Sequence, residues 1–141
     1  PIIDLTRAAE GSSTPELLQT ALAFGSQTAF SANNSTAVIA NATGFYRIFV
    51  GFGMRNDSTT ESSASLTMTD GLSVKTIFDF TLRRQSSDIN HAAQSLDFVV
   101  FLAAGESISA VSNSTAMYIN GSVRQIATGD GTLVSPNGFP V

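Results

Sequence analysis

The stretch from Leu96 to Ala127 constrains the fold most, because it divides into short alternating runs separated by turn signals. From Leu96 to Leu102 every second residue is large and apolar, which is the pattern of a β-strand with one buried face. Ala104-Gly105-Glu106 predicts a turn, after which Ile108 and Ala110 alternate with serines. These residues predict two strands joined by a tight connection.

A second turn signal, Asn113-Ser114, separates this part from a third predicted strand that starts at Ala116. Within that strand, Asn120-Gly121 predicts a bulge or a further turn before Val123. The whole stretch therefore predicts an antiparallel meander of three strands.

The same alternation continues upstream of this meander. It predicts strands over 28–32, 36–40, 44–54, 64–69 and 74–82, with a hairpin at Asp70-Gly71. Ile77 breaks the alternation of its strand and is expected to face outward. Strands at intervals of roughly 8–12 residues are typical of a sandwich. The predicted fold class is all-β, an antiparallel, jelly-roll-like β-sandwich.

The run from Gly44 to Met54 is apolar on both faces. A strand of this kind is central in its sheet or covered on both sides, in some proteins by another subunit. The face made by Tyr46, Ile48, Val50 and Phe52 is therefore the candidate oligomer interface.

The two ends of the chain are predicted to lie outside the sandwich, which spans 14–127. Residues 1–13 form an arm, and 128–141 form an extended tail with turns. Thr14-Pro15-Glu16 is a helix-start signal for one short helix that ends at Gly25, although Leu18–Phe24 also fits a strand. The predicted partner-docking residues are the large apolar ones of arm and tail, Ile2, Ile3, Leu5, Phe139 and Val141.

Composition excludes several classes of function. Only 13% of the 141 residues are charged, against about a quarter in ordinary domains. Such depletion is typical of surfaces that enter interfaces, although Ser/Thr-rich β-proteins share it. The net charge is −4 with a single lysine, so no basic stripe could bind nucleic acid. There is no cysteine, and no apolar run reaches the ~18 residues of a membrane helix.

No catalytic or metal-binding group is predicted, and no cofactor is expected. His91 stands alone in a loop, without the partners that a general base needs. Asp79 and Asp97 would be the acid and base of a hydrolase, but exposed carboxylates on strands usually serve only solubility. Asp57, Glu61 and Asp70 lack the spacing of a calcium loop.

The phenylalanines are assigned to the core in preference to a sugar-stacking platform, because carbohydrate sites use Trp and Tyr more often. The residues concerned are Phe45, Phe49, Phe52, Phe78, Phe80, Phe98 and Phe101.

The last third of the chain resembles small β-sandwich structural proteins of tailed phages, in particular the decoration or cement proteins of their capsids. The residues that carry the resemblance are the hydrophobic strand and turn of Val99–Ile108, the Ser/Asn turn after it, and the closing strand Gly121–Ala127. The resemblance implies a non-enzymatic homotrimer on the capsid surface, made in the host cytoplasm. Its partners would be the major capsid protein and further copies of itself.

Docking of several weak contacts would fasten such a protein, since each contact becomes intramolecular after the first. Two alternatives stay open at this point. One is a carbohydrate- or host-receptor-binding module of a phage fibre or tail, and the other is a hydrolase on a jelly roll.

Overall fold

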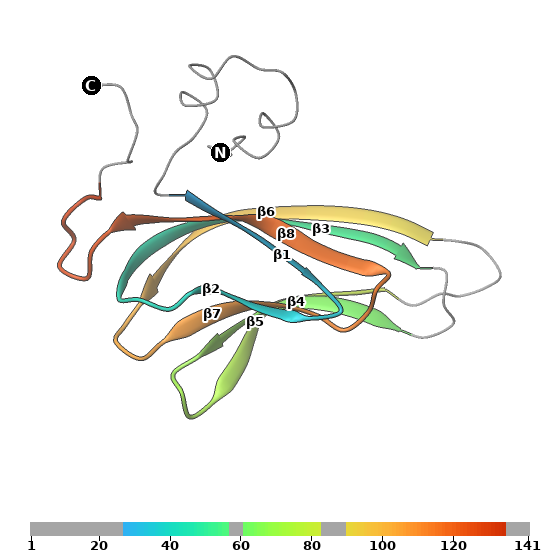
Figure 1. Cartoon of the computed structure of the whole chain (residues 1–141), viewed down its shortest axis with the longest axis horizontal. Helices are drawn as coiled ribbons and strands as arrows, with labels where there is room; N and C mark the ends of the chain where they lie inside the picture. The colour runs from blue at the N-terminus through green and yellow to red at the C-terminus, as the bar shows by residue number, and fades with distance from the viewer. Residues whose placement is uncertain (1–26, 57–60, 83–89, 135–141) are drawn as a thin grey trace, which may run out of the picture.

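A computed structural model describes residues 27–56, 61–82 and 90–134 of the chain. Within these residues the chain forms eight β-strands (Figure 1). The strands are β1 (Gln27–Asn33), β2 (Thr36–Ala40), β3 (Gly44–Asn56), β4 (Ser62–Thr69), β5 (Val74–Leu82), β6 (Asn90–Leu102), β7 (Ser107–Ser112) and β8 (Met117–Ala127). The predicted all-β class is confirmed. The predicted short helix and its alternative strand lie outside the described residues.

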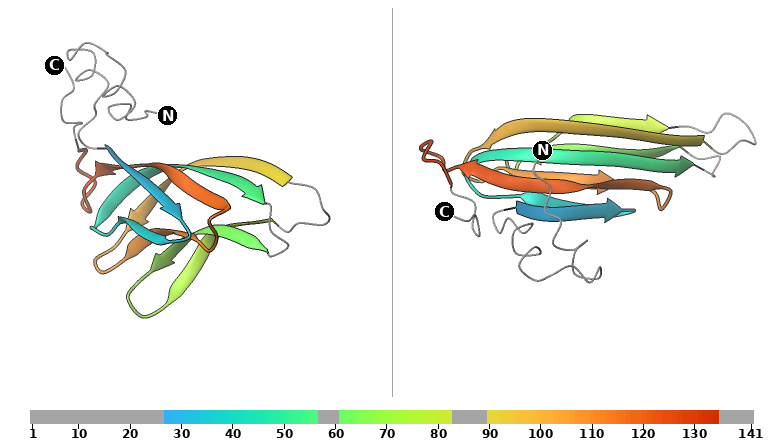
Figure 2. Two further views of the ribbon diagram at one scale, coloured as in Figure 1. Left: turned by 45° about the vertical axis from the view of Figure 1, so that its right-hand side comes forward. Right: turned by 90° about the horizontal axis from the view of Figure 1, so that it is seen from above.

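The strands form two antiparallel four-stranded sheets that pack face to face as a sandwich (Figure 2). Sheet A has the order β1-β8-β3-β6, and sheet B has the order β2-β7-β4-β5. β3 is central in sheet A and pairs along its whole length with β6, from Gly44 opposite Leu102 to Asn56 opposite Asn90. This apolar strand, as long as β6, is therefore paired on both edges.

The core lies between the inner faces of the sheets, because alternate residues of each strand point inward. Phe52 of β3 contacts two rings of β5, with centroid distances of 5.1 Å to Phe78 and 5.8 Å to Phe80. These contacts join sheet A to sheet B. The largest fully buried apolar side chains are Ile48, Val50, Phe52, Leu66, Leu102, Ile108, Met117 and Ile119.

The predicted meander is wrong, although its strands and turns are present. β6 pairs with β3 in sheet A, β7 pairs with β2 and β4 in sheet B, and β8 returns to sheet A between β1 and β3. Each tight connection therefore crosses from one sheet to the other. The alternating pattern shows which face of a strand is buried, but the same pattern fits a partner in either sheet.

The turns form where Gly and Asp were predicted to make them. Gly105 has φ +86°, and the amide of Glu106 donates to the Ala103 carbonyl at 3.2 Å. Asp70 accepts hydrogen bonds from the amides of Leu72 and Ser73, at 2.9 and 2.8 Å, and closes the β4–β5 hairpin. These amide hydrogen bonds hold the pKa of Asp70 below its usual value.

The two irregularities that the sequence suggested have different outcomes. Ile77 faces outward, as predicted, since Phe78 and Phe80 on either side of Asp79 point to the core, and the register of β4 with β5 shifts beside it, at Leu66/Thr67. Asn120-Gly121 is neither a turn nor a bulge, since β8 pairs continuously with β3 through both residues. Gly121 is needed for another reason: a Cβ on it would overlap the backbone carbonyl of Phe49.

We predict that Gly121→Ala lowers the free energy of unfolding by about 2 kcal/mol, because overlap with a backbone carbonyl forces the paired strands apart. Gly53→Ala is the matched control on the neighbouring strand β3, since nothing lies within 4 Å of its added Cβ. Urea denaturation of both variants measures the difference. Equal midpoints would contradict the close approach.

Candidate protein-interaction surfaces

The outer side of sheet A carries aromatic and aliphatic side chains. We call this surface, formed by the outward residues of β1, β8, β3 and β6, the sheet A face. Val99, Phe101 and Tyr118 are 56%, 42% and 47% exposed on it. The rings of Phe45 and Phe101 pack together with centroids 4.8 Å apart. Exposed apolar groups of this kind mark surfaces that other proteins cover.

Three of the side chains that the structure describes on this face are charged. The guanidinium of Arg47 donates two hydrogen bonds to Asp97, Nε to Oδ1 at 3.0 Å and Nη2 to Oδ2 at 2.6 Å. This pair lowers the pKa of Asp97 and raises that of Arg47. Arg124 is the third, and β8 places it directly opposite Arg47 of β3. The positive charges of Arg47 and Arg124 therefore face each other, and the carboxylate of Asp97 is hydrogen-bonded to Arg47.

The side chain of Arg124 has a hydrogen-bond donor without an acceptor. Its Nε–H is buried and has no partner, and it is the one side-chain nitrogen or oxygen in that state among the described residues. A buried donor without an acceptor costs about 1–3 kcal/mol. The sheet A face is therefore incomplete at Arg124.

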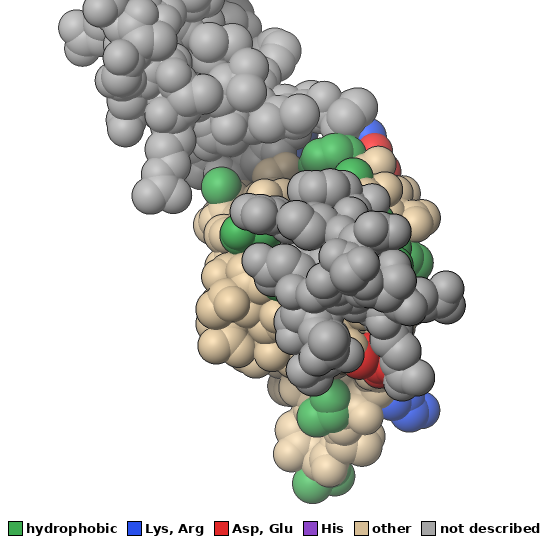
Figure 3. Space-filling model, turned by 90° about the vertical axis from the view of Figure 1, so that its right-hand side faces the viewer, with side chains coloured by type: hydrophobic (Ala, Val, Ile, Leu, Met, Phe, Trp, Pro, Cys, Tyr) green, Lys and Arg blue, Asp and Glu red, His purple; other side chains and the backbone are tan. Residues whose placement is uncertain are grey.

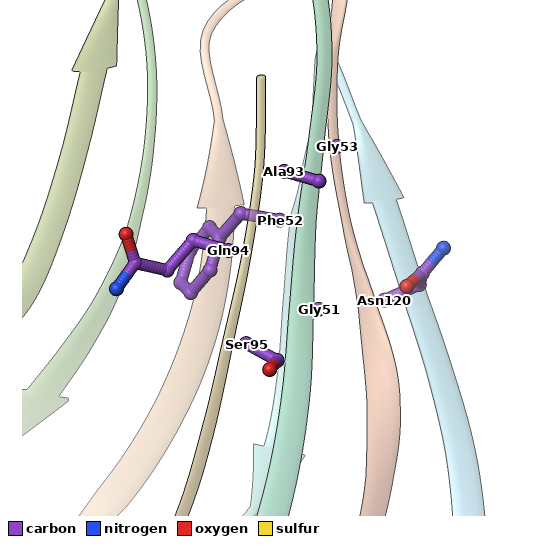
Figure 4. A pocket seen from close by; sticks show the side chains of 7 residues that line it. All are labelled: Gly51, Phe52, Gly53, Ala93, Gln94, Ser95 and Asn120. Atoms are coloured by element: carbon purple, nitrogen blue, oxygen red, sulfur yellow. The ribbon is translucent and has the colours of Figure 1, made fainter.

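A shallow pocket of about 350 Å³ lies at the other end of the sheet A face, beside Gly51 and Gly53 of β3. Figure 4 shows Phe52 and Gln94 pointing to one side of the sheet, and Ala93, Ser95 and Asn120 pointing to the other. The glycines leave the floor of the pocket without side chains. Their lack of side chains makes the space of the pocket.

The outer side of sheet B has a different chemistry. Its paired rows are small and uncharged, with Ser65 opposite Val111 and Thr67 opposite Ser109. Asp79 also points outward and accepts a hydrogen bond from the Thr81 hydroxyl at 2.8 Å. The two outer faces of the sandwich are thus unlike.

The β4–β5 hairpin projects beyond the sandwich and has an apolar tip. Leu72 and Val74 are 97% and 69% exposed. In Figure 3 the hairpin is the lowest part of the molecule, where hydrophobic side chains stand out from a surface with few charges. A second hollow, of about 260 Å³, separates the hairpin from the β6–β7 turn and is lined by Asp70, Lys75 and Glu106 among others.

After β8 the chain turns back on itself. Asp130 accepts hydrogen bonds from the Thr128 hydroxyl at 2.5 Å and the Thr132 amide at 3.0 Å, which lower its pKa to about 2. The Val134 amide then donates to the Ile126 carbonyl at 2.9 Å. This part of the predicted tail is an ordered turn beside β8, which Asp130 stabilises through these hydrogen bonds.

The candidate oligomer interface on β3 needs correction. Tyr46, Ile48, Val50 and Phe52 are 8%, 0%, 0% and 2% exposed, because sheet B of the same chain covers them. The opposite face of β3, with Phe45 and Phe49, is the one that points outward. The predicted docking residues Ile2, Ile3, Leu5, Phe139 and Val141 lie outside the described residues.

The residues weighed for chemistry do not come together. Asp79 lies on the outer side of sheet B and Asp97 on that of sheet A, so they cannot act as a pair on one bond. Asp70 serves the hairpin turn. In the described ranges no three acidic or histidine side chains are grouped to hold a metal ion, and no helix is long and apolar enough to cross a membrane. His91, which was expected in a loop, lies instead in β6 opposite Arg55 of β3, and its side chain is not described.

The phenylalanines divide between the two sides of the sheets. Phe52, Phe78, Phe80 and Phe98 belong to the core or pack against it, as predicted. Phe45, Phe49 and Phe101 point outward instead. Sequence reasoning missed Arg124 altogether, and only its position opposite Arg47 across the β3–β8 ladder could have drawn attention to it.

No protein-family model and no curated protein matches the chain. Two solved structures do, each of a pentameric capsid protein isolated from metagenomic phage sequences, the second phased with iodide. Both are 30% identical to this chain with a TM-score of 0.69, and the match covers 96% of this chain and 83% and 84% of theirs. The chain belongs to this family of phage capsid proteins. The predicted phage structural protein is confirmed, and its location is the virion.

We predict that Asp97→Asn lowers the thermal midpoint at neutral pH, because Arg47 then loses its acceptor and faces Arg124 uncompensated. Since the folded-state pKa of Asp97 is lowered, its contribution is present above the unfolded pKa of about 3.9 and lost as pH falls through the folded value. The difference from wild type should therefore vanish in strong acid.

Asp79→Asn is the matched control, an outward strand carboxylate bonded to a hydroxyl, and should change the midpoint less. Thermal melts followed by circular dichroism across the acid range test both variants. A deficit in the Asp97→Asn variant that is independent of pH would contradict the role of the ion pair.

Proposed function

We propose that this protein is a non-enzymatic component of a phage capsid that assembles into a closed ring and cements neighbouring coat subunits. The observation that carries the proposal is the 30% identity, over 96% of the chain, to a capsid protein that is pentameric. A ring of five copies is therefore preferred to the trimer that the sequence suggested.

The two outer faces of the sandwich support a ring. A cyclic ring of more than two copies uses heterologous contacts, in which one surface of each copy meets a different surface of the next. The sheet A face is aromatic and holds Arg47, Arg124 and Asp97, whereas the outer side of sheet B is rich in Ser and Thr. Because the two faces differ, the sheet A face of one copy can meet a part of the next copy that is not itself a sheet A face.

The positions where the described chain begins and ends support the cementing role. Gln27 pairs with Arg124, and Val134 bonds to Ile126, so both terminal segments leave the sandwich beside the same end of β8. Segments that leave together can engage the same neighbour together. Each then raises the effective concentration of the other.

The first test is the mass of the protein in solution. Light scattering after size exclusion should give five times the 14.7 kDa chain, about 74 kDa, at concentrations where a contact between two copies alone would dissociate. A stable monomer would contradict the ring. A mass of three chains would instead support the trimer that the sequence suggested.

The second test concerns the cementing role. Deletion of residues 1–13 should leave the sandwich folded, because the described strands begin at Gln27, and should weaken binding to empty coat shells about ten-fold or more. A variant that keeps the length but replaces Ile2, Ile3 and Leu5 with Ser is the matched control for chain length, and it should fail equally. Co-sedimentation with the shells measures binding, and full binding by either variant would remove the arm from the proposal.

A further inference from the structure

We propose that the sheet A face receives the N-terminal segment of a neighbouring copy, with Asp4 of that segment bound to Arg124 and Ile2 covering Val99. The inference rests on the proposed ring and names the surface and the residues that join its members. Loss of the arm then weakens binding to the coat shells because single copies, without the ring, make fewer contacts at once.

Arg124 lacks a hydrogen-bond acceptor on this face among the described residues. Its buried Nε–H has no partner, and the nearby carboxylate of Asp97 is already taken by both hydrogen bonds from Arg47. A carboxylate is the strongest partner for a guanidinium, because it accepts charge-assisted bonds at two oxygens. The occupant of the face therefore brings a carboxylate.

An apolar surface lies beside the guanidinium of Arg124. Val99 and Phe101 of β6 are about half exposed, and Arg47 and Val99 follow Arg124 in one row across the sheet. An occupant that satisfies Arg124 alone would leave these side chains in water. It needs aliphatic groups within a few residues of its carboxylate.

The N-terminal segment has this chemistry. Residues 1–26 hold Asp4, Glu10 and Glu16 against one Arg7, so the segment is net acidic, whereas the described side chains of the sheet A face hold two arginines and one aspartate. Asp4 alone of these carboxylates is flanked on both sides by large aliphatic residues.

The length of this segment is compatible with the distance between β8 and β6. Two strand spacings separate β8 from β6, about 9.5 Å. An extended chain from Ile2 to Asp4 spans about 7 Å, and the side chains of Asp4 and Arg124 can reach across the remaining few ångströms. A segment lying across the strands can therefore put Asp4 near Arg124 and Ile2 over Val99 at once.

The length of the segment permits transfer to the next copy. Residues 5–26 can span up to about 70 Å when extended, far more than the width of one sheet. The segment joins β1 at Gln27, in the same row as Arg124. In a ring each copy gives its segment to one neighbour and receives one from the other, so every sheet A face is covered once.

Cross-linking tests the inference directly, because the chain has no cysteine of its own. The Ile2→Cys/Val99→Cys double variant is treated with a short bis-maleimide and separated under denaturing conditions. We expect a ladder that ends at the covalent ring. Cross-linked monomer alone would show that the segment folds onto its own domain, and absence of cross-links would remove it from this face; either result overturns the proposal.

The Ile2→Cys/Thr36→Cys variant is the matched control, because Thr36 is exposed on the outer side of sheet B, away from the proposed site. It should give no ladder, and an equal ladder would show that cross-linking is unspecific and overturn the proposal.

Charge exchange tests the pairing of Asp4 with Arg124. In the cross-linking background, Arg124→Asp should reduce the ladder about ten-fold, and adding Asp4→Arg should restore most of it. Circular dichroism checks that each variant is folded, and Arg124→Gln serves as a second variant if reversal prevents folding. A full ladder with Arg124→Asp, or no rescue, would overturn the pairing.

Failure of this inference can be told from failure of the ring. If light scattering shows a closed oligomer and the ladder is absent, the copies join through another surface. If the protein is monomeric, the proposed function fails first.

Discussion

Burial of alternate side chains between the two sheets is the interaction on which the whole structure depends. β3 supplies Ile48, Val50 and Phe52 to this layer, each essentially inaccessible to solvent, and each such burial is worth about 2 kcal/mol. The rings of Phe78 and Phe80 on β5 contact Phe52 from the opposite sheet. With the inner face of β3 filled in this way, its outer face is the one left to meet other molecules.

The consequence is a division of roles along single strands. Consecutive residues of β3 alternate between the core and the sheet A face, so Arg47 and Phe49 are outward because Ile48 and Val50 are inward. The same alternation on β8 sends Val123 inward and Arg124 outward. The placement of Arg124 opposite Arg47 thus follows from the packing of the core, and the surface must neutralise the charges that result.

Of these two arginines, only Arg47 is paired with a carboxylate of the described chain. Asp97 holds Arg47 with two hydrogen bonds, while Arg124 keeps a buried donor without an acceptor among the described residues. Exposed aromatic groups and few charges surround it. A protein that remained alone in solution would gain little from such a face, whereas a capsid protein that packs against its neighbours has a use for it.

The sequence by itself determined most of the strands, the turns at Gly105 and Asp70, and the all-β class, because the period-two pattern and such turn residues act locally. It also indicated a phage structural protein. Only the tertiary structure decided that β6, β7 and β8 alternate between sheets, and that Tyr46 and Phe52 belong to the core. The pairing of strands and the burial of side chains depend on residues far apart in the chain. The buried donor without an acceptor at Arg124 likewise arises only once the four strands of sheet A lie side by side.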